Sequence, residues 1–217
     1  MVREFFTSRS EGNLALHVGD DHERVLAARA ALAQRLSLPV SNVKYMNQVH
    51  GNTVAIVDAT SGEPTADALI TTDRSVALAV LVADCLPVLL RTKNVIGVIH
   101  AGRAGIVQRV IPHTIEAVRS RDSSPISIVI GPAICGRCYE VSPEIYHEVT
   151  SQVPATATHH ESSHSKNCLD LRAGARAQCE EYGITPTIVE KCTQESADLF
   201  SYRASKVTGR QAGVIAW

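Results

Sequence analysis

Aromatic residues, long apolar runs and an excess of charge of one sign are all scarce in this chain, and each scarcity excludes a class of protein. Phe, Trp and Tyr make up 4% of the 217 residues, which argues against a surface that stacks nucleic-acid bases. The formal net charge is −1 and the basic residues are scattered, so neither a nucleic-acid groove nor a membrane-surface helix is expected. The longest apolar run, residues 76–82, is far shorter than the roughly 20 residues that cross a bilayer.

The N-terminal residues, MVREFF, contain no apolar run of signal-peptide length. We therefore expect a cytoplasmic protein, and its length suits a single domain that spans residues 1–217. In a reducing compartment cysteines are more often thiols or metal ligands than disulfides. The six cysteines are Cys85, Cys135, Cys138, Cys168, Cys179 and Cys192.

Hydrophobic periodicity predicts alternating helices and strands. Helices are expected at residues 21–36, 106–119, 142–149 and 169–183. Strands are expected at residues 43–49, 53–58, 67–72, 76–83, 87–92, 95–101, 126–131, 185–190 and 212–217. Several of these strands are almost wholly apolar, which is typical of strands that are covered on both faces.

The most polar stretch, residues 153–167, contains the string His160-Glu161-x-x-His164. This is the zinc-protease spacing, which functions only when a helix brings both histidines to one face. Ser, Thr and His are poor helix formers and no apolar stripe accompanies them, so the stretch is predicted to be a surface loop. Glu180 or Glu181 could serve as a distant third ligand, which keeps the protease alternative open, but we expect the motif to be accidental.

A more convincing set of metal ligands lies at the ends of predicted strands. His50 follows one strand, Cys85 a second, and His100 ends a third. Two imidazoles and a thiolate suit zinc, and three protein ligands leave the fourth tetrahedral position open for water or substrate. Taken singly, a cysteine after an apolar strand is usually a small buried apolar residue, and a histidine there is usually only hydrogen-bonded.

The order of sequence blocks resembles the laccase-domain family, once labelled multicopper polyphenol oxidases. The blocks are NLALHVGDD, NQVHG, ADALITT, ADCLPVLL, HAGRAG, GPAICGRCYEV, CT and FSYR…TGRQAG, which cover nearly the whole chain. The resemblance implies a single mixed α/β (α+β) domain with largely buried mixed sheets and flanking helices. It also implies a zinc ion on His50, Cys85 and His100, although copper remains an alternative. The implied reactions are phosphorolysis of adenosine, inosine and S-methyl-5′-thioadenosine, with adenosine deamination as a side activity.

The block that contains His100 departs from the family pattern, H-A-G-W-R-G. Arg103 stands at the tryptophan position and Ala104 at the arginine position, while the family's S-Y-R-R is reduced to S-Y-R-A at residues 201–204. We hypothesise that Arg103 replaces the missing arginine as a phosphate ligand. The competing hypothesis assigns phosphate to Arg203 and Arg210, because the planar fork of arginine matches phosphate oxygens.

Five further positions are weaker candidates for the site. Asp84 could bind ribose or orient a ligand histidine, or it could simply cap a turn. Asn47 and Gln48 could recognise a base edge or tie down their own loop. Cys135 and Cys138 form a C-x-x-C pair without a second such pair, so a redox or metal role is weakly indicated.

Three other functions compete with phosphorolysis. A multicopper oxidase needs His-x-His pairs, and this chain has none. A zinc-dependent amide hydrolase that edits a peptidoglycan precursor would use similar metal–water chemistry and stays open as the alternative. A purely structural zinc module normally uses four protein ligands, whereas only three agree here.

Overall fold

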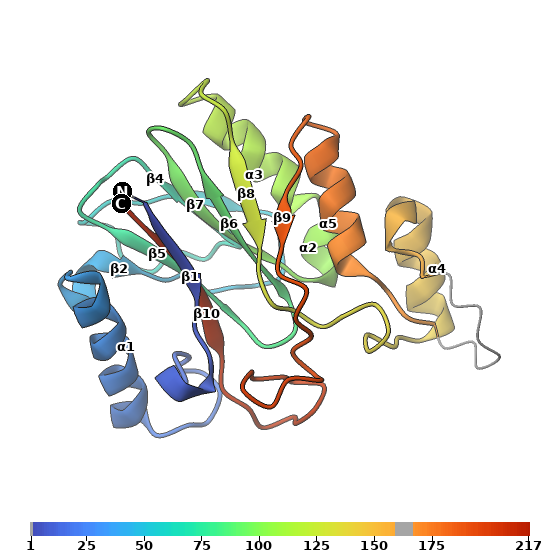
Figure 1. The fold of residues 1–217 in the computed structure, drawn as a ribbon, viewed down its shortest axis with the longest axis horizontal. Helices are drawn as coiled ribbons and strands as arrows, with labels where there is room; N and C mark the ends of the chain where they lie inside the picture. Colours follow the sequence, from blue (N-terminus) through green and yellow to red (C-terminus); the bar gives the residue numbers. More distant parts are fainter. Residues whose placement is uncertain (1, 159–166) are drawn as a thin grey trace.

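Two mixed β-sheets packed face to face form the centre of the molecule (Figure 1). The computed structural model describes residues 2–158 and 167–217. The smaller sheet has the order β1 (Arg3–Phe6), β10 (Gln211–Ala216), β5 (Ala77–Val82) and β2 (Val43–Lys44). The larger sheet has the order β3 (Val54–Ile56), β4 (Ala68–Thr71), β7 (Ile96–Ala101), β6 (Leu86–Arg91), β8 (Ser127–Ile130) and β9 (Thr187–Ile188). The predicted mixed, single-domain α+β class is confirmed.

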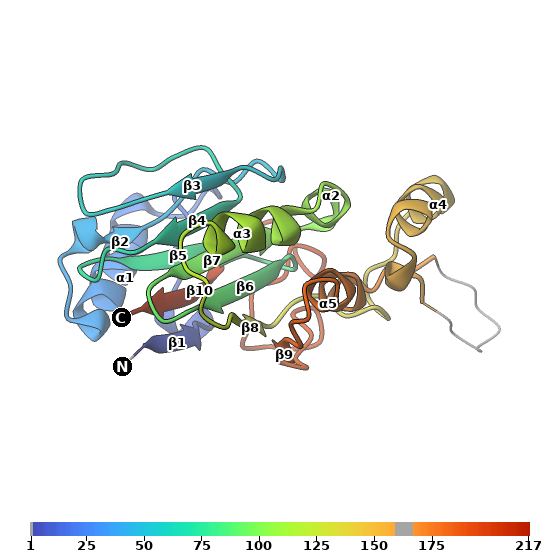
Figure 2. The same cartoon turned by 90° about the horizontal axis from the view of Figure 1, so that it is seen from above.

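Helices cover the two outer faces of this double sheet, so that the layers run helix, sheet, sheet, helix (Figure 2). Helix α1 (His22–Leu36) packs on the smaller sheet, and α2 (Arg103–Val107), α3 (Val110–Arg119) and α5 (Leu171–Glu180) pack on the larger one. Helix α4 (Pro143–Gln152) lies at one end, beyond the sheets (Figure 1). Three short 3-10 helices, Arg9–Glu11, Val40–Asn42 and Pro154–Thr156, complete the elements.

Strand residues alternate between two cores, as the two-residue repeat of a strand requires. On β5, Ala77, Ala79 and Leu81 face α1, whereas Leu78, Val80 and Val82 face the larger sheet. On β7, Ile96 and Val98 lie in the core between the sheets, so His100 is on the same side, at the end of that core. The fold thus delivers a polar side chain to one edge of an otherwise apolar layer.

Several predicted boundaries were wrong, among them those at residues 43–49, 106–119, 142–149 and 153–167, and local hydrogen bonds explain the first two. The strand expected over residues 43–49 stops at Lys44, because the Gln48 amide both donates to and accepts from the Leu81 backbone and replaces the ladder there. The helix expected over residues 106–119 is divided into α2 and α3 at Arg109, whose φ of 61° is left-handed. Asn52 donates to the Gln108 carbonyl at this break.

The third boundary is that of the helix expected over residues 142–149, which continues to Gln152. The fourth is that of the predicted surface loop 153–167: it begins with a 3-10 helix whose Thr156 is fully buried. The residues of the His160–His164 motif lie outside the described part of the chain. Strand β1 was not predicted; it pairs antiparallel with β10, which places the two ends of the chain side by side (Figure 1). Within residues 2–158 and 167–217, no helix combines the length and the apolar character that crossing a membrane requires.

Candidate functional site

Three side chains from separate parts of the sequence meet at the edge between the two sheets. His50 lies in the β2–β3 connection, Cys85 in the β5–β6 connection, and His100 on β7. One ligand atom from each lies within 4.8 Å of those of the other two, and Cys85 Sγ is 4.0 Å from His50 Nε2. The two imidazole rings meet edge to face with centroids 4.7 Å apart. The structure therefore brings together the three residues that the sequence singled out.

Asp67 holds two members of this cluster in place through hydrogen bonds. Its carboxylate is fully buried and accepts a 2.8 Å hydrogen bond from His100 Nδ1. It also accepts from the backbone N–H groups of His50 at 2.9 Å and Gly51 at 2.7 Å. One carboxylate thus fixes the ring of one histidine and the loop that carries the other. A carboxylate–histidine pair of this kind typically orients a metal ligand and sets its tautomer.

The cluster also shifts the pKa values of its own members. Burial alone would raise the pKa of the Cys85 thiol, but the neighbouring His100 and His50 lower it to about 6. Burial alone would lower the pKa of His100, but Cys85 and Asp67 raise it to about 9. Asp67 has a lowered pKa because the hydrogen bonds from His100 and Gly51 outweigh its burial. The thiolate is thus favoured even before any cation binds, and a thiolate is the form in which cysteine binds metals.

Backbone conformation keeps the space around the cluster open. A Cβ atom at Gly102 would lie 3.0 Å from Cys85 Sγ and 3.1 Å from His50 Cδ2, so a larger residue here would press on two of these ligands. His50 has a φ of 60° and Asp84 a φ of 99°, values that non-glycine residues rarely adopt. Such conformations persist where the surrounding contacts enforce them, often at functional sites.

A cavity of about 510 Å³ opens onto the cluster, large enough for a small-molecule ligand. Its wall includes the three cluster residues, two arginines and an apolar side. The lining residues are His17, Gln48, His50, Leu81, Val82, Ala83, Asp84, Cys85, His100, Tyr139, Tyr202, Arg203 and Arg210. Burial lowers the pKa of Arg210, but arginine still remains charged at neutral pH.

Asp84 joins three segments of this wall. Its Oδ1 accepts a 2.6 Å hydrogen bond from Thr193 Oγ1, and its Oδ2 accepts a 2.8 Å bond from the backbone N–H of Arg203. The Asp84 carbonyl also accepts from the backbone N–H of Ile134 at 3.0 Å. These contacts suit a residue that positions the cavity wall, and both carboxylate oxygens already have protein donors.

The remaining sequence candidates occupy different positions. Gln48 lines the cavity, but both ends of its amide bind the Leu81 backbone. Asn47 donates to Thr65 and is absent from the cavity wall. Arg103 is also absent from that wall. Burial raises the pKa of the Tyr139 phenol, and the positive charge of Arg103 offsets part of that increase.

Sequence reasoning missed several residues of the site, among them Asp67, Thr193, Tyr139, Leu81 and Tyr202. Asp67, Thr193 and Tyr139 all belong to quoted blocks (ADALITT, CT and GPAICGRCYEV), but none carries a pattern that separates it from an ordinary turn or core residue. A buried aspartate directly before a wholly apolar strand was the one available signal, because buried carboxylates are rare without partners.

The fold and the cluster define the class: a mixed α+β domain with a His–Cys–His donor set on the wall of a cavity between its sheets. The sequence profile of the family described as multi-copper polyphenol oxidoreductase laccase matches residues 5–217. The chain belongs to this family.

Curated relatives carry a different name from the family. A purine nucleoside phosphorylase of Streptomyces coelicolor is 44% identical over 94% of this chain and 87% of its own length. One of Corynebacterium glutamicum is 38% identical over 99% of this chain and 94% of its own length. Among solved structures, a Neisseria meningitidis protein superposes with a TM-score of 0.87 at 33% identity, covering 99% of this chain and 93% of its own.

Proposed function

We propose that this protein is a purine nucleoside phosphorylase whose active site is the cavity at His50, Cys85 and His100. The observation that carries the proposal is the presence of two arginines, Arg203 and Arg210, on the same cavity wall as a metal-type donor set. Phosphorolysis needs one place for phosphate and another for a nucleoside, and this cavity offers charged and apolar sides. The names of the Streptomyces and Corynebacterium relatives support the same reaction.

The donor set fits zinc. Zinc favours imidazole and thiolate ligands, and this site offers two imidazoles and one thiolate beside Gly102, which has no side chain to fill the space. A carboxylate that accepts a hydrogen bond from one imidazole is the usual supporting contact of such a site. Electron-transfer copper sites with two histidines and a cysteine add a weak axial methionine, glutamine or backbone oxygen. No methionine is among the described residues that line this cavity, and both ends of the Gln48 amide bind the Leu81 backbone. A zinc ion held by His50, Cys85 and His100 would supply a positive charge and an open coordination position.

The chain's own residues divide the work of binding. Arg203 and Arg210 bind phosphate, since arginine pairs with phosphate oxygens through two parallel hydrogen bonds. The Arg203 guanidinium is held in place, because Nη1 donates a 2.6 Å hydrogen bond to the Glu140 carbonyl and the group lies over the Tyr139 ring. Leu81 and Tyr202 offer an apolar surface to the nucleoside. Asp67 keeps His100 oriented throughout.

The proposed substrates are adenosine, inosine and S-methyl-5′-thioadenosine. The direct test incubates the purified protein with adenosine or inosine, with and without phosphate, and separates bases and sugars by chromatography. Free base that appears only with phosphate supports phosphorolysis, and inosine formed from adenosine supports the proposed deaminase side activity. If neither product forms, the phosphorylase proposal fails and hydrolysis of an amide becomes the reaction to test.

A further inference from the structure

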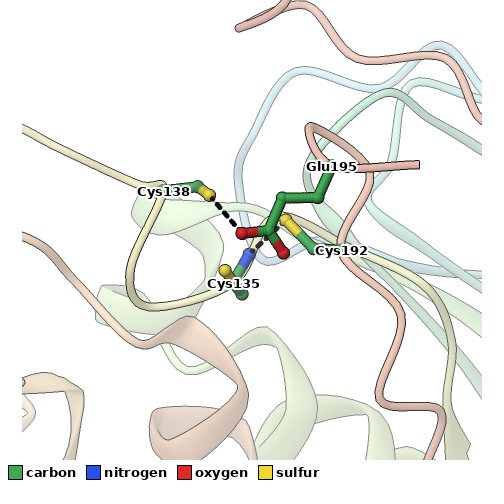
Figure 3. A group of neighbouring side chains, drawn as sticks. All are labelled: Cys135, Cys138, Cys192 and Glu195. Carbon is green, nitrogen blue, oxygen red and sulfur yellow. Dashed lines mark hydrogen bonds between the residues drawn. The ribbon is translucent and has the colours of Figure 1, made fainter. Parts of the chain in front are cut away.

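A second group of metal-type side chains lies outside the cavity just described. Cys135, Cys138, Cys192 and Glu195 each present one ligand atom, and these four atoms all lie within 4.8 Å of one another (Figure 3). We propose that these four residues bind a second metal ion, a structural zinc. The sequence reveals only the C-x-x-C pair, and the fold supplies the other two ligands from a segment more than fifty residues away.

Backbone hydrogen bonds assemble the four ligands without a metal. The Cys135 carbonyl accepts from the N–H groups of Cys138 at 3.0 Å and Tyr139 at 3.1 Å, so the turn carries both sulfurs toward one side. The second segment is joined to the first by a parallel bridge between Ala133 and Cys192. A donor set that is held in place by the fold loses little freedom when an ion binds.

Arg172 links the two segments that carry the four ligands. This side chain is 7% exposed, and its Nη2 donates 2.6 Å hydrogen bonds to the carbonyls of both Ala133 and Lys191. One guanidinium therefore fixes the chain shortly before Cys135 and immediately before Cys192. The spacing of the sulfurs is thus a property of the fold as a whole.

The contacts among the ligands suit a thiolate centre. The backbone N–H of Cys135 points at Cys192 Sγ, 3.4 Å away, and hydrogen bonds of this kind stabilise metal-bound sulfur. Cys138 Sγ lies 3.5 Å from Glu195 Oε1, and the Arg137 guanidinium lies 3.5 Å from Glu195 Oε2 and offsets negative charge. In tetrahedral zinc sites with bonds of about 2.3 Å, sulfur atoms lie roughly 3.8 Å apart, so only a small contraction is needed.

The number and type of ligands distinguish this centre from the first one. Three thiolates and a carboxylate fill all four tetrahedral positions, which is the pattern of a structural site, whereas His50, Cys85 and His100 leave one position open. A disulfide would use two of the three sulfurs and leave the third sulfur and Glu195 without a role. A cavity of about 680 Å³, whose wall includes Cys135, Cys192 and Glu195, gives ions a path from solvent.

The second centre would act on the first through the chain. Thr193, next to Cys192, donates to Asp84, which precedes Cys85. Tyr139, next to Cys138, lines the active cavity under the Arg203 guanidinium. A zinc ion here would therefore fix two parts of that cavity's wall, without touching substrate.

The test counts zinc by mass spectrometry in protein produced in zinc-supplemented medium and purified without chelator. About two zinc ions per chain are expected in the parent and in the matched control Cys179→Ala, a buried cysteine outside both groups. Cys135→Ser/Cys138→Ser and Cys85→Ala should each retain about one. A parent with a single zinc that Cys85→Ala abolishes would overturn the proposal, as would a disulfide among Cys135, Cys138 and Cys192 in protein isolated without reductant.

Two further measurements keep the proposal testable if the double variant fails to fold. X-ray absorption at the zinc edge of the parent should give an average of two sulfur ligands per zinc, one at the first centre and three at the second. An average of one or fewer would contradict the second centre. Glu195→Gln should lower the affinity of the more thiolate-rich site by at least about 10-fold in a chelator competition, because losing a direct ligand costs no less than losing the partner of one; an unchanged affinity would remove Glu195 from the ligand set. None of these measurements depends on phosphorolysis, so either proposal can fail alone.

Discussion

Asp67 holds His100 through a 2.8 Å hydrogen bond to Nδ1, which leaves Nε2 as the ring nitrogen available to a cation beside Cys85. The same carboxylate binds the backbone of the loop that carries His50. Two of the three cluster residues, His100 and His50, therefore depend on Asp67, which is not itself one of the candidate metal ligands.

Asp67→Asn should weaken zinc binding at the first centre by roughly 10–100-fold, the usual effect of losing such a supporting carboxylate. The asparagine oxygen can still accept from His100, but its NH₂ group would then face the N–H of Gly51, now 2.7 Å from the carboxylate. Chelator competition with Asp67→Asn measures the loss. Asp58→Asn, which alters an exposed carboxylate that also accepts backbone N–H groups, is the matched control and should bind zinc as the parent does. Equal affinities for both variants would contradict the role given to Asp67.

Gly102→Ala should displace the first metal centre while the fold persists. The new methyl group would lie 3.0 Å from Cys85 Sγ, closer than ordinary contact, so a ligand side chain has to move. We expect loss of phosphorolysis and of about one zinc, with a circular dichroism spectrum like that of the parent. Gly62→Ala introduces the same methyl group where nothing lies within 4 Å and should change neither property. Full activity in Gly102→Ala would show that the cluster tolerates displacement.

The three arginines should differ in their effect on phosphate. Arg203→Ala and Arg210→Ala each remove a charged group from the cavity wall, and a hydrogen bond to a charged group contributes about 1.5–3 kcal/mol. We therefore expect each variant to raise the KM for phosphate, or to lower kcat/KM, by roughly 10–150-fold. Arg103→Ala should have a smaller effect, because Arg103 is absent from the cavity wall.

Phosphate kinetics of the three variants decide between the two hypotheses for the missing family arginine. The largest effect in Arg103→Ala, with Arg203→Ala and Arg210→Ala close to the parent, would restore Arg103 as the phosphate ligand. Zinc content should stay at the parent level in all three, since none of them is a metal ligand.

Asp122 gives the fold a pH-dependent contribution that is separate from both metal centres. Hydrogen bonds from the Thr92 hydroxyl at 2.7 Å and from the backbone N–H groups of Ser124 and Asn94 lower its pKa. A lowered folded-state pKa stabilises the protein above the unfolded-state value of about 3.9, and this stability is lost as the pH falls through the folded-state pKa. Urea unfolding of Asp122→Asn should show a constant deficit from neutral pH to about pH 5, narrowing below about pH 4. A deficit that widens in acid would reverse this assignment.

Sequence periodicity predicted the strands that are buried on both faces because their residues are almost all apolar, without interruption in β5 and with the single polar residue His100 in β7. It failed where a side chain replaces backbone pairing, as Gln48 does beside Leu81, and where one residue breaks a helix, as Arg109 does. It also missed β1, a short edge strand that begins with the two exposed charged residues Arg3 and Glu4. Such features depend on partners that are distant in sequence, which local patterns do not encode.

The first donor set could be found from sequence because each ligand ends or follows a predicted strand, although the strand before His50 ends earlier than predicted. The second could not, because Cys192 and Glu195 join Cys135 and Cys138 only through the β8–β9 pairing and the bridge that follows it. Asp67 was missed for a similar reason, since its importance lies in three hydrogen bonds across the fold.

Zinc-dependent phosphorolysis at His50, Cys85 and His100 is tested by following hypoxanthine release from inosine as zinc is returned to metal-depleted protein, with and without phosphate. We expect no release without phosphate, activity that rises with zinc in the parent and in Cys179→Ala, and none at any zinc concentration in Cys85→Ala. Release in Cys85→Ala that matches the parent would contradict the assignment of the active site to His50, Cys85 and His100. Release without phosphate at the same rate would contradict phosphorolysis itself.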